Sequence, residues 1–419
     1  MSDGLFRRFV LASGLTNLAD GIATVAWAWL ASLLTRDPLL IALVPVALRL
    51  PWFLCAIPAG IVTDRTDRRI LILRMDILRA SAFFVAAFGV WFAMPLPPIP
   101  KDGISSQNLF LIIICAASVV GVAEVFRDNA AQTMLPSIVP HQSLEKANGQ
   151  LWSVELVGNA LLGPALGAFL IAYALPAPFF INGFAYLAAI ILVFRLSGRF
   201  RPEVTGARDW RRELKEGYTF LQNAPLLRSL AWITGFWNLF FQMVMIALVL
   251  HVQENLGLDA RTYGLILASG AFGGILGGWW GDSIIGFLGP KKTAQWMLIA
   301  SAPAFLAIAY APGPLMLGLV LAIFEFTGLV WNTVSVSYRQ RAIPDALLGR
   351  VNSLYRLMAW GMMPIGLLLS GLLVRMSDGY LARDTALIVP IFAAAIGALF
   401  LGLLGWGALS RGFRGQKQD

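Results

Sequence analysis

The chain has 419 residues, of which 58% are hydrophobic and only 13% are charged. Its mean hydropathy is +0.73, whereas soluble domains carry about 25% charged residues. This composition excludes an ordinary soluble globular protein and predicts a polytopic membrane protein. The apolar runs are long and continuous instead of alternating in segments of about ten residues, so we expect membrane-spanning helices and an all-α fold.

The formal net charge is +9, but the basic residues lie at the ends of apolar segments and do not cover one soluble face. Sorting of positive charge to the inner side of a membrane explains this pattern better than nucleic-acid binding. Cys55 and Cys115 fall inside apolar segments, and His141 and His251 are far apart. We therefore expect no disulfide framework, no metal site and no cofactor.

Twelve apolar segments follow one another along the chain, each near the crossing length of about 20 residues. They are 9–33, 39–60, 76–95, 107–127, 150–174, 178–197, 227–251, 261–284, 294–311, 314–338, 351–375 and 385–409. The segment 1–8 is short and polar, and the apolar run after it is too long for a cleaved signal peptide, so we expect it to be retained as the first span. Lysine and arginine concentrate in the connections after even-numbered spans, which predicts that both termini are cytoplasmic.

The longest polar stretch separates the sixth and seventh spans. It predicts a six-helix bundle over 1–197, a cytoplasmic linker over 198–225 and a second six-helix bundle over 226–419. Within the linker, the sequence W-R-R-E-L-K-E-G-Y favours an amphipathic surface helix.

Two stretches of the chain repeat one another, which indicates that the two bundles are related in parallel. I-V-P-H-Q-S-L-E-K-A-N-G precedes the fifth span and A-I-P-D-A-L-L-G-R-V-N-S precedes the eleventh. At one constant offset, Pro140 aligns with Pro344 and Asn148 with Asn352.

Three ionisable side chains lie near the centres of spans, where each costs several kcal/mol on insertion scales and is therefore a functional candidate. Asp20 and Arg49 have equal depth on successive antiparallel spans, so they can form a pair, either structural or active in proton or substrate binding. Glu325 has no basic neighbour in its own span; it suits reversible proton binding, or a carboxylate that lines a cavity. These three are the candidates for proton coupling.

A second group of charges lies at the inner ends of spans, where side chains reach the interface at low cost. Glu124, Arg127 and Asp128 end the fourth span, and Glu155 lies in the inner part of the fifth. We expect a salt-bridged inner gate here in preference to transport chemistry.

Polar and aromatic residues within spans favour a cavity for an amphipathic organic molecule, although amides and small residues also hold membrane helices together. The candidates for substrate contact are Trp27, Asn238, Gln242 and Trp331. The motifs G-x-S-x-G, G-x-x-x-x-G-K-[ST] and H-E-x-x-H are absent from the sequence. We therefore predict no enzyme and no ATP-driven pump of the P-loop type, which leaves an ion gradient as the energy source.

The turn between the second and third spans reads G-I-V-T-D-R-T-D-R-R, from Gly60 to Arg69. It resembles the signature of the major facilitator superfamily, approximately G-x-L-x-D-R-x-G-R-R/K, with Asp67 where the family usually has its second glycine. E-V-F-R-D-N-A-A-Q-T-M-L-P and L-L-G-R-V-N-S-L-Y-R-L are similar to segments of the drug:proton antiporter branch, which includes enterobactin-exporter-like and macrolide-efflux-like proteins. The resemblance covers nearly the whole chain.

The resemblance implies a gate at this turn. Asp64 would meet the positive N-terminal end of the eleventh span near Val351, and Arg68 would pair with Asp128, so that both contacts latch the cytoplasmic side. The residues predicted for this gate are Gly60, Asp64, Arg65, Arg68, Arg69, Glu124, Arg127, Asp128 and Glu155.

Together these features predict a monomeric secondary transporter of the bacterial inner membrane. It would export a small amphipathic organic molecule, such as a drug or siderophore, by alternating access in exchange for protons. The alternatives within transport are a lipid or lysophospholipid flippase and a proton-coupled importer; a polytopic membrane enzyme or a sensor is a remote one.

Overall fold

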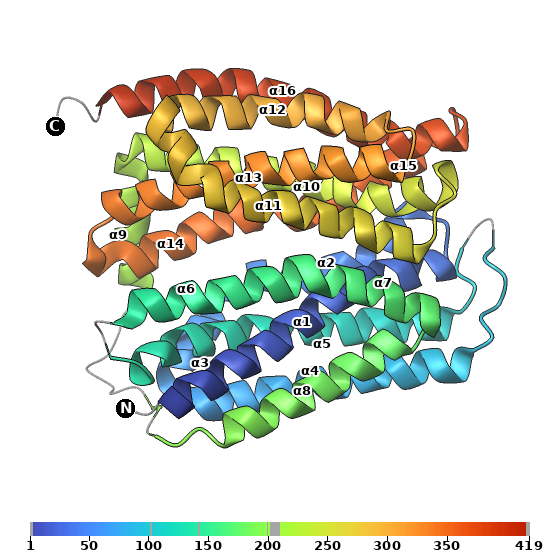
Figure 1. Cartoon of the computed structure of the whole chain (residues 1–419), viewed down its shortest axis with the longest axis horizontal. Helices are drawn as coiled ribbons and strands as arrows, with labels where there is room; N and C mark the ends of the chain where they lie inside the picture. The colour runs from blue at the N-terminus through green and yellow to red at the C-terminus, as the bar shows by residue number, and fades with distance from the viewer. Residues whose placement is uncertain (1–2, 101–102, 141–142, 199, 202–209, 416–419) are drawn as a thin grey trace. The chain divides into compact units, whose positions relative to one another are not determined.

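The computed structural model describes residues 3–100, 103–140, 143–198, 200–201 and 210–415. Within these ranges every regular element is a helix, so the predicted all-α class is confirmed (Figure 1). Eight of the described helices are long and apolar enough to cross a membrane, and a bent pair, α2 (Pro38–Leu54) and α3 (Ala56–Arg65), raises the number to nine. The helices α4 (Arg68–Ala93), α11 (Ala260–Leu288) and α12 (Pro290–Ala309) also have 26, 29 and 20 residues. The count of twelve spans stays a prediction.

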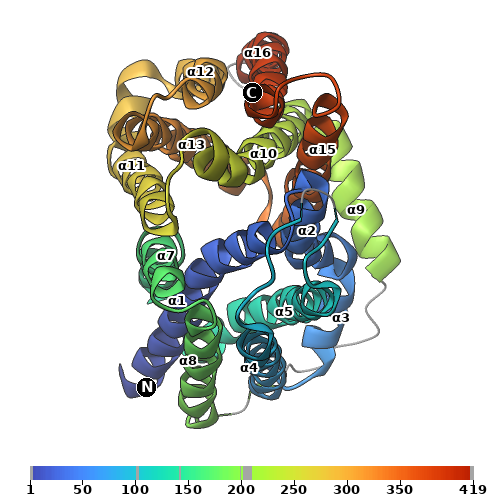
Figure 2. The ribbon, with the colours of Figure 1, turned by 90° about the vertical axis from the view of Figure 1, so that its right-hand side faces the viewer.

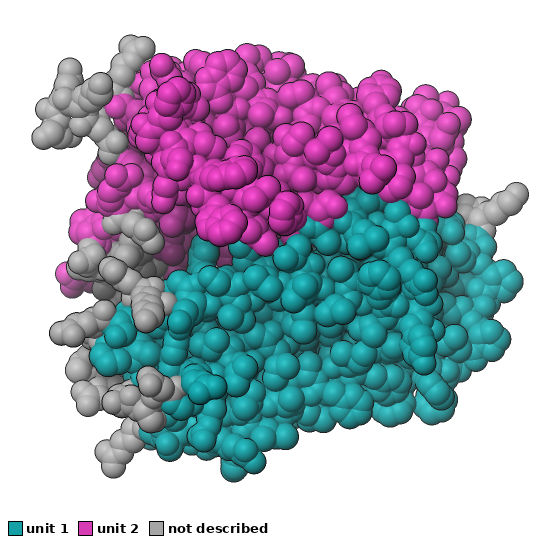
Figure 3. Space-filling view, viewed as in Figure 1, with its two compact units in different colours: residues 1–205, 259–268 teal, residues 206–258, 269–419 magenta. Residues whose placement is uncertain are grey.

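The chain forms two compact units, coloured separately in Figure 3. Unit 1 contains residues 1–205 and 259–268, and unit 2 contains residues 206–258 and 269–419. The division between residues 205 and 206 falls inside the stretch expected to be a linker. The limits predicted for the two bundles and the linker stay a prediction.

Unit 1 is organised around its first helix. Besides α2, α3 and α4, its helices are α1 (Asp3–Leu34), α5 (Gln107–Met134), α6 (Leu144–Glu155), the π-helical η3 (Leu156–Leu162), α7 (Gly163–Tyr173) and α8 (Ala177–Phe194). Figure 2 shows α1 among α2, α5, α7 and α8, all of which it contacts. The helix α4 packs against α5 and α8. The charged side chains on α1, α4 and α5 and Tyr186 on α8 therefore lie within one helix bundle.

The bend of 56° between α2 and α3 has a local cause. Pro58 lies in the first turn of α3 and has no backbone N–H, and its ring would clash with the carbonyl of the residue four positions earlier. The helix therefore breaks at Cys55, whose N–H still bonds to the Pro51 carbonyl oxygen at 2.7 Å.

Unit 2 contains the remaining helices. They are α9 (Trp210–Asn223), α10 (Pro225–Leu250), the π-helical η4 (His251–Asn255), α12, α13 (Pro314–Ala342), α14 (Asp345–Trp360), α15 (Met362–Ser377), α16 (Arg383–Gly415) and most of α11. The helix α9 coincides with W-R-R-E-L-K-E-G-Y and packs against α10 and α14. On its exposed side, the Arg212 Nε lies 3.1 Å from a Glu216 carboxylate oxygen one turn later.

The packing of unit 1 recurs in unit 2. The helix α10 packs against α15 and α16 as α1 packs against α7 and α8, and α12 packs against α13 and α16 as α4 packs against α5 and α8. The repeated stretches begin helices that break at matching points: α6 and α7 are separated by η3, and α14 and α15 by Gly361. The same sequence offset that aligns Pro140 with Pro344 places Gly361 opposite η3, so the internal repeat extends to the helix break.

The close approach of α11 and α13 in unit 2 depends on glycine. A Cβ on Gly277 would lie 2.5 Å from the Phe326 carbonyl oxygen and 3.0 Å from its Cα, whereas a Cβ on Gly278 would meet nothing within 4 Å. Backbone cannot move aside as a flexible side chain can, so Gly277 is required here while its neighbour is not.

Replacing Gly277 with alanine should therefore lower the thermal unfolding midpoint of the purified protein, since overpacking costs about 1–3 kcal/mol. Gly278→Ala is the matched control on the next residue, and its higher helix propensity should leave the midpoint unchanged or slightly raised. Equal midpoints for the two variants would contradict this packing.

Candidate functional site

Buried charges meet inside unit 1 because four helices point them at the same region. The helix α1 supplies Asp20, α4 supplies Asp76 and Arg79, α5 supplies Arg127, and α8 supplies Tyr186. Asp76 and Arg79 are three residues apart and so lie on one face of α4. Arg79 and Asp76 have fully buried side chains. Such charges in an apolar bundle must pair with one another to be tolerated.

The first half of this charge cluster links α1, α4 and α8. Arg79 donates through Nη2 to the Asp20 carboxylate, and the Tyr186 hydroxyl donates to the same oxygen at 2.6 Å. The Arg79 guanidinium carbon also lies 4.3 Å from the centroid of the Tyr186 ring. The Asp20 side chain, which is 19% exposed, therefore accepts hydrogen bonds from two donors, and its ion-pair partner is Arg79.

The second half links α1, α4 and α5 through Arg127. Its Nη2 donates to the Thr16 hydroxyl at 2.9 Å, its Nη1 to Asp128 at 3.3 Å, and its Nε lies 3.6 Å from Asp76. The planar guanidinium makes these contacts from three separate nitrogens, whereas the three donors of an ammonium share one nitrogen.

Asp76 is the least satisfied member of the cluster. Its side chain is fully buried, neither carboxylate oxygen has a hydrogen-bond partner, and its ion pair with Arg127 spans 3.6 Å. Buried polar atoms are nearly always hydrogen-bonded, so an exception of this kind requires an explanation. Two explanations are that Asp76 binds a proton, or that its carboxylate has a different partner in another conformation of the protein.

The pair expected between Asp20 and Arg49 is not the one formed. Asp20 pairs with Arg79, and Arg49 lies 3.9 Å from Glu124 with 44% of its side chain exposed. Equal depth along two helices made the pair possible but does not determine which faces turn toward each other. The role of both residues in proton coupling stays a prediction. Glu124 joins α5 to α2 through this looser contact.

Carboxylates outnumber guanidiniums in these described ion pairs. Four carboxylates, on Asp20, Asp76, Glu124 and Asp128, meet three guanidiniums, on Arg49, Arg79 and Arg127. With all seven groups ionised there is one negative charge in excess, and the innermost members, Asp76 and Arg79, are fully buried. Such an arrangement favours the uptake of a proton or another cation. That property is what a proton-linked site needs.

Glu325 in unit 2 has a different setting. It projects from α13 toward α11, where a Cβ added to Gly270 would lie 3.4 Å from its Cγ and one added to Gly274 would lie 3.8 Å from its Cβ. Among the residues that the structure describes, Glu325 has no hydrogen-bond or ion-pair partner. A partly buried carboxylate against two glycines is free to change its protonation without breaking an ion pair.

Phe324, the residue before Glu325, belongs to a stack of aromatic rings. Trp237 and Phe241 on α10 stack with Phe324 on α13, with ring centroids 5.3–5.7 Å apart and interplanar angles of 8–17°. The Trp237 indole N–H donates to the Ser301 hydroxyl at 2.9 Å. Phe324 is fully buried, whereas Trp237 and Phe241 are half-buried, so the exposed part of this stack belongs to Trp237 and Phe241.

The four candidates for substrate contact are mostly packed within their units. Trp27 is 1% exposed and contacts Phe83 and Phe179, with ring centroids 5.7 and 4.9 Å away. Asn238 is 7% exposed and donates to the Ala359 carbonyl at 2.9 Å, and Trp331 is 6% exposed in the core of unit 2. Gln242 is half-buried. These contacts favour helix packing, which the sequence left open, and the substrate role stays a prediction.

Comparison with known proteins places the whole chain in one family. Residues 1–409 match the family model described as "Transmembrane secretion effector", a major facilitator model. The chain belongs to the major facilitator superfamily. It is 26% identical over 409 residues to the multidrug efflux pump Tap of Mycolicibacterium fortuitum, covering 94% of each chain. Over 274 residues it is 28% identical to the multidrug resistance protein MdtG of Dickeya zeae, covering 62% of this chain and 60% of that protein.

Solved structures agree on the fold. A bacterial homologue of the iron transporter ferroportin has a TM-score of 0.73 at 16% identity, covering 98% of this chain and 100% of that one. The nucleoside transporter NupG has a TM-score of 0.70 at 13% identity, with 96% and 98% covered. These structures show that the chain has the fold of such proteins. The family match and the efflux-pump relatives make this major facilitator protein a membrane transporter.

In this major facilitator protein, Asp67 of the signature turn has a structural role at the start of α4. The Asp67 side chain caps the N-terminus of α4 by accepting hydrogen bonds from the backbone N–H of Arg69 at 3.0 Å and of Ile70 at 3.2 Å. An aspartate is among the best residues for this task, whereas glycine supplies no side-chain acceptor. The departure from the family signature is therefore a local gain in helix capping.

The neighbouring arginines of the turn make contacts within unit 1. Arg69 donates to the Leu196 carbonyl at 2.7 Å, and the Arg68 backbone N–H bonds to the Phe200 carbonyl at 3.3 Å. Gly60 has open space where a Cβ would lie, and Arg65 is exposed in the last turn of α3. The side chain of Asp64 lies outside the described part of the structure, so its predicted contact remains a prediction.

The pairing predicted between Arg68 and Asp128 differs from the described contact. Asp128 pairs with Arg127, its neighbour on α5. Glu155 ends α6 directly before the π-helical turn and is exposed. The residues predicted for the gate therefore fall into two groups. Glu124, Arg127 and Asp128 belong to the charge cluster of unit 1, whereas in the turn the Arg69 side chain and the Arg68 backbone N–H bond to backbone carbonyls.

Sequence reasoning missed three members of the cluster, namely Asp76, Arg79 and Tyr186. A signal existed for two of them, because Asp76 and Arg79 lie inside the predicted span 76–95. Because both lie near the inner end of that span, the expected free-energy cost of inserting their charges was low, and they were not selected. Tyr186 had no signal, since one tyrosine in an apolar helix is ordinary.

Proposed function

We propose that the protein exports a small amphipathic organic molecule, such as a drug or a siderophore, in exchange for protons. Transport would proceed by alternating access across the bacterial inner membrane, with both termini in the cytoplasm. The named relatives, both multidrug proteins, support the class of cargo. The observation that carries the proposal is the buried charge cluster of unit 1, in which carboxylates exceed guanidiniums.

The coupling step that we propose begins at Asp20. While ionised, Asp20 holds Arg79 and Tyr186 and so ties α1 to α4 and α8. A proton on Asp20 removes the charge that Arg79 opposes, which weakens this tie. Arg79 must then find another acceptor, and a rearrangement of the three helices follows from that requirement.

Asp76 and Glu325 are the other proposed proton-binding groups. Asp76 lacks hydrogen-bond partners in the described structure and would ionise fully only when Arg127 or another donor moves closer. Glu325 lies in unit 2, and its protonation would respond to a cationic or polar group of the cargo nearby. The half-buried rings of Trp237 and Phe241 would receive apolar, flat parts of the same molecule.

The signature turn acts, in this proposal, as a latch and not as a substrate site. Asp64 would bind a helix N-terminus in one state of the cycle and release it in the other. Arg65, Arg68 and Arg69 would exchange their contacts at the same step, since interfacial charge pairs break and re-form at moderate cost.

The proposal is tested with the purified protein in proteoliposomes, by recording the pH change that each compound of a panel of lipophilic organic molecules triggers. Compounds that move should drive protons in the opposite direction. Asp20→Asn and Glu325→Gln should each reduce this flux by about tenfold or more, equivalent to about 1.4 kcal/mol.

The control is Glu216→Gln, the same chemical change on the exposed side of α9, which should leave the flux unchanged. If both Asp20→Asn and Glu325→Gln leave proton-coupled flux intact, the coupling assignment is wrong. Protons and cargo moving in the same direction would make the protein an importer instead.

A further inference from the structure

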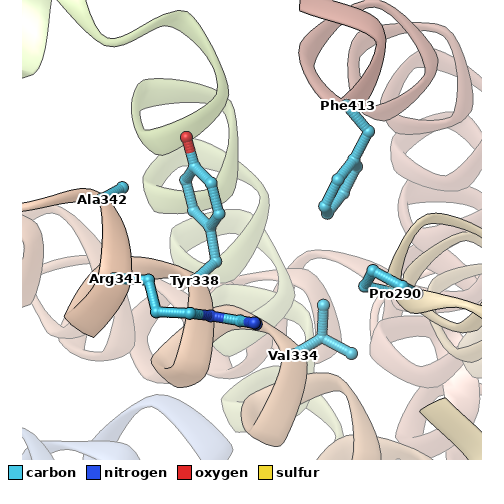
Figure 4. A pocket seen from close by; sticks show the side chains of 6 residues that line it. All are labelled: Pro290, Val334, Tyr338, Arg341, Ala342 and Phe413. Carbon is cyan, nitrogen blue, oxygen red and sulfur yellow. The ribbon is translucent and has the colours of Figure 1, made fainter. Parts of the chain in front are cut away.

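Unit 2 contains a cavity that the transport proposal does not use. It has a volume of about 230 Å³ and lies where α12 begins and where α13 and α16 end. Its lining residues are Pro290, Val334, Tyr338, Arg341, Ala342 and Phe413. Figure 4 shows Val334, Tyr338 and Arg341 rising from α13 while Phe413 reaches toward them from α16.

The walls of this cavity combine apolar groups with one cation. The rings of Tyr338 and Phe413 are 6.1 Å apart at 60°, an edge-to-face arrangement. Arg341 donates through Nε to the Ser337 carbonyl at 3.1 Å, which holds its guanidinium beside the opening. The Tyr338 hydroxyl and the guanidinium are the polar side-chain groups of the lining.

The surroundings carry positive charge. Lys291 and Lys292 follow Pro290 in the first turn of α12, and Arg411 is exposed on α16, two residues before Phe413. No acidic side chain is among the described lining residues. Pro290 has no backbone N–H and Gly289, the N-cap residue of α12, has no side chain, so Lys291 and Lys292 carry the first backbone N–H groups of this helix without a side-chain cap. The site is complementary to an anion.

The volume and the position of the cavity indicate which kind of anion fits it. Pockets for drug-sized ligands hold about 300–1,000 Å³, so 230 Å³ is too small for the proposed cargo. Two of the three helices that meet here belong to candidate membrane spans, Pro314–Arg339 and Arg383–Phe413, and the cavity lies where these spans end. The ends of membrane spans lie at the depth of phospholipid headgroups. Basic pockets between transmembrane helices at this depth suit anionic headgroups.

We propose that this cavity binds an anionic phospholipid, with its phosphate at Arg341 and the first part of its chains against Tyr338 and Phe413. Lys291 and Lys292 would attract the headgroup from the side of α12. The proposal requires only that the protein is embedded in a membrane, so it is independent of the direction and the coupling of transport.

The test uses the full-length protein purified in a neutral detergent, with lipid retention followed by native mass spectrometry and stability by thermal unfolding. Phosphatidylglycerol should be retained and raise the unfolding midpoint, and phosphatidylcholine should do neither. Arg341→Gln should reduce retention of phosphatidylglycerol about fivefold, the effect of one basic residue near an anionic surface. Ala342→Phe, which fills the cavity and keeps every charge, should reduce it as well.

Lys215→Gln is the matched control, because it removes one exposed positive charge from α9, outside the cavity. An equal loss of lipid in Lys215→Gln and Arg341→Gln would show unspecific attraction and overturn the proposal. Native retention in both Arg341→Gln and Ala342→Phe would do the same. The last measurement uses inorganic phosphate. If phosphate alone raises the unfolding midpoint as much as phosphatidylglycerol does, the cavity is a simple anion site and the lipid proposal is refuted.

Discussion

Replacing Arg79 with alanine will destabilise the protein by about 3–5 kcal/mol, because removing one partner of a buried ion pair leaves the other charge uncompensated. The Arg79 side chain is fully buried, and Asp20 accepts hydrogen bonds from both Arg79 and Tyr186. The loss is measured as a change in the free energy of unfolding, from denaturant titration of the purified protein in detergent. Transport should be lost in the same variant.

We attribute the loss of stability in Arg79→Ala to the unpaired charge left on Asp20, and a double variant tests this attribution. Asp20→Asn with Arg79→Gln removes both charges and keeps similar volumes, so it should recover most of the stability but not the transport. Arg49→Ala is the control within the same cluster: its pair with Glu124 spans 3.9 Å and is 44% exposed on the arginine side, so its loss should cost less than about 1 kcal/mol. A double variant as unstable as Arg79→Ala would refute an electrostatic origin.

Replacing Arg127 with lysine will also impair the protein, although the charge is conserved. Arg127 reaches Thr16, Asp76 and Asp128 on three helices through three different nitrogens. A lysine has its three donors on a single nitrogen and so cannot reproduce contacts that arise from three separate nitrogens, and hydrogen bonds to charged groups are worth about 1.5–3 kcal/mol each. We expect a loss of about 2–3 kcal/mol in the free energy of unfolding and a lower turnover in proteoliposomes.

Arg74→Lys is the matched comparison for this change, since Arg74 is exposed on α4. That variant should retain native stability and turnover. If Arg127→Lys were equally harmless, the cluster would need only a positive charge between α1 and α5, and the geometry of the guanidinium would have no role.

The fold was predictable to a large extent because membrane helices follow from composition and length. Long apolar runs must form helices in a bilayer, where every backbone polar group needs a partner within its own segment. The predicted segment 178–197 appears as α8, Ala177–Phe194, and 294–311 as α12, Pro290–Ala309. The repeat read from Pro140 and Pro344 likewise corresponds to two broken helices in equivalent places.

The family could also be identified from the sequence, since the turn from Gly60 to Arg69 carries its signature and the match to the family model spans residues 1–409. The role of Asp67 within that turn could not be predicted from the sequence. A departure from a motif shows that a residue differs, whereas only the backbone N–H groups of Arg69 and Ile70 show what the new carboxylate binds.

What the sequence by itself determined was therefore the membrane environment, the helical class, the internal repeat and the presence of costly charges such as Asp20 and Glu325 inside spans. The tertiary structure decided which charges meet. Asp20 pairs with Arg79 on α4 and not with Arg49 on α2, and Arg127 draws Asp76 into the cluster. The physical reason is that hydropathy determines the depth of a residue in the membrane, while its partner depends on how each helix is rotated and which helix packs beside it.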